Sequence, residues 1–319
     1  MEPASELTPE LRVFVEFVAK KGRELYRDLP WRRTYDPYAI WISEVMLQQT
    51  QVSRVDGRWQ RWLERFPTVD ALAAAAPSDV LEEWQGLGYN RRALSVHRAA
   101  QAISEAGGIF PQDSKELVKL PGIGPATAAG IRAFAFNLHG VYLETNVRTV
   151  FLHELYPQAE GVPDSELVPL VELTCPASVA DAGNADSAAN VADAANAVDA
   201  DSAANDATAE LTPRSWYYAL LDYGAYLKKT IPNPSRRSKS HVKQSRFEGS
   251  HRQKRAELLR VLLAHKDEGG AVFETLHQEL CQIEVNAGRE TLDEQVTLGL
   301  LEELAKEGFC QKNDEYWLP

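Results

Sequence analysis

The stretch LPGIGPATAAG at residues 120–130 constrains the fold more than any other part of this sequence. Gly122 and Gly124 permit positive φ angles and a close approach of the backbone, and Pro125 suits the first turn of a new helix. A helix, a glycine-rich turn and a second helix direct backbone N–H groups and a helix N-terminus at an anion. One phosphate of a DNA backbone fits this geometry, because it is bound without regard to base sequence. The alternative is a tight connection between packed helices that binds nothing.

The rest of the chain is predicted to be mostly helical. From residue 8 to about residue 157, prolines mark successive helix boundaries, and the alternating, β-branched pattern of strands is scarce. Further helices are expected near residue 170, over 215–229 and after residue 246. The ending FCQKNDEYWLP is typical of two short strands around an Asn-Asp turn. We therefore predict an all-α core at 1–246 and a small winged-helix-like module at 247–319.

The net charge of −12 hides two segments of opposite sign. Residues 176–210 hold six Asp, one Glu and no Lys or Arg. This tract has almost no large apolar side chain to bury, so we expect a disordered surface insertion. Residues 226–260 hold eleven Lys and Arg against two Glu. We call this second segment the basic stripe; it is a candidate phosphate-binding surface, although such runs also occur as linkers.

Composition also bears on the compartment and on membranes. No stretch approaches the ~20 apolar residues that a membrane span needs. The first residues, MEPASELTPELRVF, lack the basic-then-apolar layout of a signal peptide. The three cysteines, Cys175, Cys281 and Cys310, are scattered and form no CxxC motif. We expect a cytoplasmic protein with reduced thiols.

The segment SEVMLQQTQV at residues 43–52 is predicted to be an amphipathic helix with one carboxylate in an unusual place. Glu44 lies opposite the apolar face, on the side of Trp41, Gln48 and Gln51. A solvated helix face would account for an isolated Glu. An aromatic ring and two amides around a carboxylate are instead typical of a pocket, so the wider pattern must decide between these interpretations.

Several segments share their order and spacing with one enzyme family. They are LPWRRTYDPYAIWISEVMLQQTQVSRV (29–55), WQGLGYNRRALSVHRAA (84–100), GGIFP (107–111), LPGIGPATAAGI (120–131), NVRTV (146–150) and ALLDYGA (219–225). On these segments the chain resembles the helix-hairpin-helix (HhH-GPD) DNA glycosylases, and the MutY-type adenine DNA glycosylases in particular. The resemblance covers roughly residues 10–230 apart from the acidic tract, and it implies a two-lobed, all-α core.

The resemblance also implies a monofunctional hydrolase that cleaves the N-glycosidic bond of a flipped-out base. It assigns the catalytic glutamate of the family to Glu44, which would protonate the leaving base. That role requires a pKa above the ~4.3 of a free Glu, and burial would raise it. The second carboxylate of the family is an Asp; here Glu144 stands in its place, two residues before the matching Asn146. Glu144 would stabilise the sugar cation, and a charge at a helix end is the alternative.

The remaining expected contacts are with double-stranded DNA that carries a mispaired or damaged base. The glutamines after Glu44 match positions where the family contacts the opened duplex. The DNA-binding residues expected from the motifs and the basic stripe are Trp31, Arg32, Gln48, Gln49, Gln51, Leu87, Tyr89, Gly122, Gly124, Lys228, Lys229, Arg236, Arg237, Lys239 and Lys243.

The chain departs from the family pattern in three respects. Bifunctional relatives place a Lys where this chain has Ala126, so no Schiff base can form there. Most members hold an iron–sulfur cluster with four cysteines just after the segment matching ALLDYGA, whereas this chain has none there. We therefore expect no cofactor and no metal site. The module at 247–319 does not resemble the family's domain for oxidised guanine, and we expect it to contact a partner protein or support a lobe.

These departures leave the substrate open. Adenine opposite guanine or oxidised guanine is the leading candidate. Thymine or uracil opposite guanine, or a deaminated purine, is the alternative within the same chemistry. A non-catalytic binder of abasic or kinked DNA is the alternative from another class. We expect a monomer associated with the nucleoid.

Overall fold

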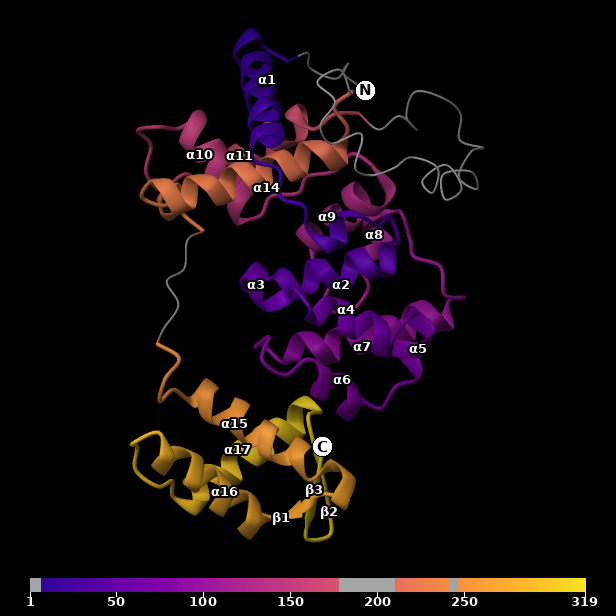
Figure 1. Ribbon diagram of the computed structural model, residues 1–319, viewed down its shortest axis with the longest axis vertical. Helices are drawn as coiled ribbons and strands as arrows, with labels where there is room; N and C mark the ends of the chain where they lie inside the picture. The colour runs from indigo at the N-terminus through magenta and orange to yellow at the C-terminus, as the bar shows by residue number, and fades with distance from the viewer. Residues whose placement is uncertain (1–6, 178–209, 241–245) are drawn as a thin grey trace. The chain divides into compact units, whose positions relative to one another are not determined.

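The computed structural model describes residues 7–177, 210–240 and 246–319 (Figure 1). Helices dominate these residues, as the all-α prediction requires. Contacts divide the chain into unit 1, which is Met1–Glu44 with Phe110–Val242, and unit 2, which is Val45–Ile109 with Lys243–Pro319. Most of the acidic tract, and Lys243 of the basic stripe, lie outside the described residues. The boundary that we placed at 246/247 stays a prediction.

Unit 1 is organised around one long helix, α14 (Pro213–Thr230). Helices α1, α9 and α10 pack against it, and Figure 1 shows α1 and α10 beside it. A Cβ on Gly224 of α14 would lie 2.3 Å from the backbone oxygen of Asn146, so this glycine permits the close approach of α10. The other elements are α1 (Pro9–Glu24), η1 (Pro30–Arg32), the first part of α2 (Pro37–Leu47), α8 (Ser114–Leu117), α9 (Pro125–Phe136), α10 (Thr145–Glu154), α11 (Asp164–Thr174) and η3 (Pro234–Arg237).

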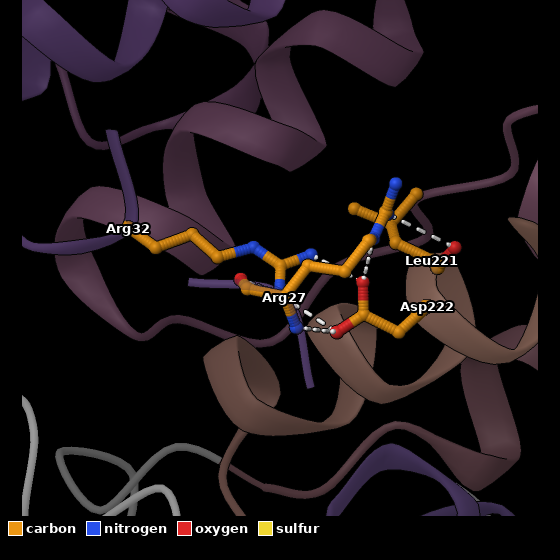
Figure 2. A network of polar contacts seen from close by, with 4 residues as sticks. All are labelled: Arg27, Arg32, Leu221 and Asp222. Atoms are coloured by element: carbon orange, nitrogen blue, oxygen red, sulfur yellow. Dashed lines mark hydrogen bonds and ion pairs between the residues drawn. The ribbon is translucent and has the colours of Figure 1, made fainter. Parts of the chain in front are cut away.

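A buried ion pair anchors the N-terminal segment of unit 1 to α14 (Figure 2). Asp222 accepts hydrogen bonds from Arg32 Nη1 at 2.7 Å and Nη2 at 2.8 Å, and from Arg27 Nε at 2.5 Å. Arg32 is 3% exposed and Trp31 is 4% exposed. Both side chains are enclosed and the Arg32 charge is paired with Asp222, and our expectation that these two residues bind DNA stays a prediction.

Unit 2 combines a helical layer with a small sheet. The sheet has the order β1-β3-β2 with antiparallel neighbours, and Trp317 pairs with Ala271 on one side and with Lys312 on the other. The predicted C-terminal hairpin is confirmed, whereas the two-residue strand β1 was not predicted. The elements are α3 (Val52–Val55), α4 (Arg58–Arg65), α5 (Val69–Ala74), α6 (Pro77–Glu83), α7 (Arg91–Glu105), α15 (His251–Ala264), η4 (Lys266–Glu268), β1 (Ala271–Val272), α16 (Phe273–Asn286), α17 (Glu294–Glu307), β2 (Gln311–Asn313) and β3 (Tyr316–Leu318).

Ion pairs attach the C-terminal part of unit 2 to α6 and α7. Lys266 Nζ lies 2.5 Å from Asp79 Oδ1 and 2.9 Å from Glu82 Oε2. Arg91, at the start of α7, pairs with Glu307 at 2.6 Å. In the described part of the chain, no helix has both the length and the apolar character that crossing a bilayer demands.

Candidate active site

The candidate site in unit 1 begins with Glu44 on α2. Its side chain is partly buried, and its Oε2 accepts a hydrogen bond from the hydroxyl of Tyr142 at 2.9 Å. Tyr142 itself is 6% exposed, and its ring makes edge contacts with Phe134 at 5.2 Å and Tyr217 at 5.3 Å between centroids. Glu44 is therefore not on a solvated helix face, which was the simpler interpretation of the sequence.

The absence of a side chain at Gly130 makes room for this carboxyl group. A Cβ at that position of α9 would lie 2.4 Å from Glu44 Oε2 and 2.9 Å from Tyr142 Cε2. Real Cβ atoms essentially never come so close to another atom. Gly130, the last residue of the glycine motif, thus lies directly against the Glu44 carboxyl group.

The surroundings of Glu44 favour its neutral form. Burial raises the pKa of Glu44 to about 8; the hydrogen bond from Tyr142 opposes this shift, and the charge of Glu144 adds to it. A carboxyl with this pKa is mostly protonated at neutral pH. It can therefore donate a proton under conditions in which an exposed Glu could not.

Glu144 is the N-cap of α10 and has a different environment. Its Oε1 accepts hydrogen bonds from the backbone N–H of Asn146 at 2.5 Å and of Val147 at 3.1 Å. Burial raises the pKa of Glu144, while these N–H groups and the charges of Lys228 and Arg148 act to lower it. Glu144 therefore does lie at a helix end, as the alternative interpretation predicted. Its charge also raises the pKa of Glu44, so the two carboxyl groups interact.

Asn146 links Glu144 to the basic stripe. Lys228 Nζ donates a hydrogen bond to Asn146 Oδ1 at 2.9 Å. Lys228 is otherwise exposed, as is Lys229 beside it. One cation of the stripe therefore lies at the site itself.

The glycine motif forms the predicted turn between two helices, α8 and α9. Asp113 caps α8 by accepting from the backbone N–H of Lys115 at 2.8 Å. Gly122 has φ +76°, which a glycine adopts without strain. Gly124 has φ −85° and caps α9 without a side-chain hydrogen bond. A Cβ on Gly124 would meet nothing within 4 Å, so the N-terminus of α9 is open to an approaching group.

The predicted DNA-contact residues of unit 2 are brought together by Arg92. Its guanidinium donates to the backbone oxygens of Gln48 at 2.7 Å, Leu87 at 3.2 Å and Gly88 at 3.0 Å. Burial lowers the pKa of Arg92 to about 10. Arg92 therefore holds the end of α2 against the turn that follows α6.

Within this group, exposure separates the side chains that can reach a ligand from those that cannot. Tyr89 is 41% exposed, and Gln49 and Gln51 are also exposed. Gln49 and Tyr89 have positive φ angles of 53° and 51°. The side chain of Leu87 is 3% exposed, and its expected contact with DNA stays a prediction.

The described part of the basic stripe has two kinds of arginine. Arg237 donates from Nη2 to the backbone oxygen of Leu152 at 2.8 Å and from Nη1 to those of Tyr156 and Ala159. It caps the C-terminal end of α10, and our assignment of Arg237 to a phosphate clamp stays a prediction. Arg236 and Lys239 are exposed, and their predicted role is unaffected.

The model of the family described as "HhH-GPD superfamily base excision DNA repair protein" matches residues 42–212, more than half of the chain. The chain belongs to the HhH-GPD superfamily. Adenine DNA glycosylase of Mycolicibacterium smegmatis is 42% identical over 152 residues, which cover 47% of this chain and 52% of that protein. The human adenine DNA glycosylase is 39% identical over 134 residues, covering 39% of this chain and 24% of that protein. The chain thus matches about half or less of the length of these relatives.

A solved structure adds support for the HhH-GPD fold. A thermostable thymine-DNA glycosylase superposes with a TM-score of 0.52, covering 70% of this chain and 90% of that one. The two sequences are 20% identical, so this likeness concerns the fold alone.

The residues present do not fit the iron–sulfur cluster of many HhH-GPD proteins. Cys175 lies in unit 1, whereas Cys281 and Cys310 belong to unit 2, and no other cysteine exists in the sequence. The segment after α14 instead holds Arg237 and a backbone bridge between Val162 and Ser238. Among the described residues, no group of three or more His, Cys, Asp or Glu is arranged to hold a metal ion. The expectation of a cofactor-free protein stays a prediction.

The contacts that three residues make in this HhH-GPD site could not be predicted from the sequence. Tyr142 was missed because a tyrosine in a loop carries no periodic signal. Gly130 belongs to the hairpin motif, and nothing in that motif indicates that it lies against Glu44. The position of Lys228 in the basic stripe predicts phosphate binding, and nothing in its spacing indicates a contact with Asn146.

Proposed function

We propose that this chain is a monofunctional DNA glycosylase that hydrolyses the N-glycosidic bond of a flipped-out, mispaired base in double-stranded DNA. Adenine opposite guanine or oxidised guanine is the substrate that we favour. The observation that carries the proposal is the Glu44 carboxyl group, which accepts a hydrogen bond from buried Tyr142 and interacts with the second carboxyl group, Glu144. Two interacting carboxyl groups can divide the roles of acid and of charge stabiliser between them in glycosidic bond cleavage.

In the proposed reaction Glu44 acts as the general acid. Departure of a purine from deoxyribose becomes easier once a ring nitrogen is protonated, and Glu44 keeps its proton up to about pH 8. Proton transfer leaves Glu44 as a carboxylate, which can then accept a proton from the attacking water. As the bond between base and sugar breaks, its electron pair goes to the base and a cation develops on the sugar.

Glu144 would stabilise that cation as a carboxylate. Burial raises the pKa of Glu144, but two backbone N–H groups and the charges of Lys228 and Arg148 act in favour of its ionised form. Glu44 instead accepts a hydrogen bond from the neutral phenol of Tyr142. Two carboxyl groups, one protonated and one ionised, are the arrangement that glycosidic bond cleavage uses. Ala126 supplies no amine, so the sugar would be left as an abasic site with an intact strand.

Support for DNA as the partner comes from the turn at 120–124 and from the family. The open N-terminus of α9 suits a backbone phosphate, and exposed cations of the basic stripe add attraction that is independent of base sequence. The curated relatives named above are adenine DNA glycosylases. The identity of the mispaired base is the more specific part of the proposal, and the experiment below is designed to test it.

The test is a panel of duplexes carrying adenine opposite guanine or oxidised guanine, thymine or uracil opposite guanine, or a deaminated purine. Alkali treatment after incubation reveals abasic sites. We expect release of adenine, with strand cleavage only after alkali. Release should decline as pH rises through about 8, because Glu44 then loses its proton. Glu44→Gln should bind the same duplex while releasing base at least ~10²-fold more slowly.

Other outcomes of the panel would change the proposal in defined ways. Release of thymine, uracil or a deaminated purine alone would replace the substrate and keep the chemistry. Tight binding of abasic DNA without release of any base would identify a non-catalytic binder. Wild-type rates in Glu44→Gln would remove Glu44 from the mechanism.

A further inference from the structure

We propose that Tyr142 is a positioning residue that occupies Oε2 of Glu44 and so keeps the transferable proton on Oε1. The inference rests on the proposed function, because it concerns the group that would act as the acid. It assigns a task to a residue outside the carboxyl pair and outside the glycine turn.

The two oxygens of the Glu44 carboxyl group are not equivalent in this site. Oε2 accepts the hydrogen bond from Tyr142 at 2.9 Å, and it also lies against α9 at Gly130. An oxygen that accepts from a phenol and abuts a helix backbone has little space for a proton aimed at a substrate. Oε1 is therefore the oxygen from which a base can be protonated.

Tyr142 is itself held firmly enough to fix this orientation. Its ring contacts Phe134 and Tyr217, and its backbone N–H donates to the hydroxyl oxygen of Tyr217 at 3.1 Å. That hydroxyl in turn donates to the backbone oxygen of Gly140. The phenol of Tyr142 thus reaches Glu44 from a packed and hydrogen-bonded support.

The phenol stays neutral while Glu44 changes charge. Burial, with the charges of Glu44 and Glu144, raises the pKa of Tyr142 well above its usual value. Tyr142 therefore remains a hydrogen-bond donor throughout the working pH range. Hydrogen bonds to ionised acceptors are stronger than neutral ones, so this contact tightens when Glu44 gives up its proton. Among the described residues, Glu144 and Tyr218 also interact electrostatically with Glu44.

The decisive variant is Tyr142→Phe, which removes the hydroxyl and keeps the ring. We expect single-turnover release of the base to slow about tenfold at neutral pH, while the Kd for duplex stays the same. We also expect the falling limb of the pH profile to move to higher pH, because the hydrogen bond that opposes the raised pKa of Glu44 is gone. The matched control is Tyr223→Phe, which removes a buried hydroxyl that donates to Glu154 instead of to Glu44; it should lower thermal stability without moving that limb.

Carboxyl NMR of the DNA-free protein separates failure of this inference from failure of the proposed function. Titration of Glu44, assigned with Glu44→Gln, should show a higher pKa in Tyr142→Phe than in the wild type, whatever substrate the protein has. An unchanged Glu44 pKa would overturn the inference even if base release proves correct. A raised pKa without loss of rate on an accepted duplex would also overturn it, since positioning would then be dispensable. If the wild type releases no base from any duplex, the proposed function fails, and positioning of a catalytic proton fails with it.

Discussion

Gly130→Ala tests whether the close approach of Gly130 to the Glu44 carboxyl group sets the catalytic geometry. The new Cβ would lie 2.4 Å from Glu44 Oε2, whereas ordinary van der Waals contact begins at 3.4 Å. The carboxyl group must therefore move by about 1 Å, a displacement that can cost roughly 10²-fold in rate. The same Cβ would press on Tyr142 Cε2 at 2.9 Å, so both partners of the hydrogen bond are disturbed.

The effect on stability should be small by comparison. Overpacking a buried position typically costs about 1–3 kcal/mol. Alanine in place of glycine within a helix stabilises the folded state by about 1 kcal/mol. We expect a net loss of at most ~2 kcal/mol in the free energy of unfolding, so the variant should fold and can be assayed.

The assay is single-turnover release of the base from an excess-enzyme complex, with thermal unfolding measured in parallel. The matched control is Gly299→Ala on α17, where a Cβ would meet nothing within 4 Å. This control should be slightly more stable than the wild type and equally active. A Gly130→Ala protein with the wild-type rate and pH profile would refute the geometric reasoning, because Glu44 would then tolerate a 1 Å shift or would not be the acid.

Two further predictions concern the basic stripe. Arg237→Ala should lower the free energy of unfolding by about 2 kcal/mol or more through loss of its hydrogen bonds to the end of α10, seen by thermal or urea unfolding. Arg236→Ala should leave stability unchanged and instead reduce the log–log salt slope of DNA binding by about 0.9. Equal unfolding curves for the two variants would show that Arg237 does not stabilise the end of α10. Lys228→Gln and Lys229→Gln should each reduce that slope, but only Lys228→Gln should move the rising limb of the pH profile to higher pH. The reason is that Lys228 lowers the pKa of Glu144, and identical rising limbs would argue against this coupling.

Local patterns in the sequence determined the helices and the hairpin, whereas the two carboxylates were singled out by the resemblance to the HhH-GPD glycosylases. Proline, capping residues and apolar periodicity act over a few neighbouring positions, so they can be read without the fold. The glycine turn and the spacing around Glu44 and Asn146 belong to motifs of this local kind. The expectation of a raised Glu44 pKa followed from the role that this resemblance implies.

Tertiary packing alone decided which side chains surround that carboxyl and which charges are free. Tyr142 lies 98 positions from Glu44 in the sequence, and Lys228 lies 82 positions from Asn146. Arg32 and Arg237 look like ordinary surface cations in the sequence, yet one is paired with Asp222 and the other caps α10. A cation's burial and its partners depend on contacts between segments that are distant in the chain, and no local pattern encodes those contacts.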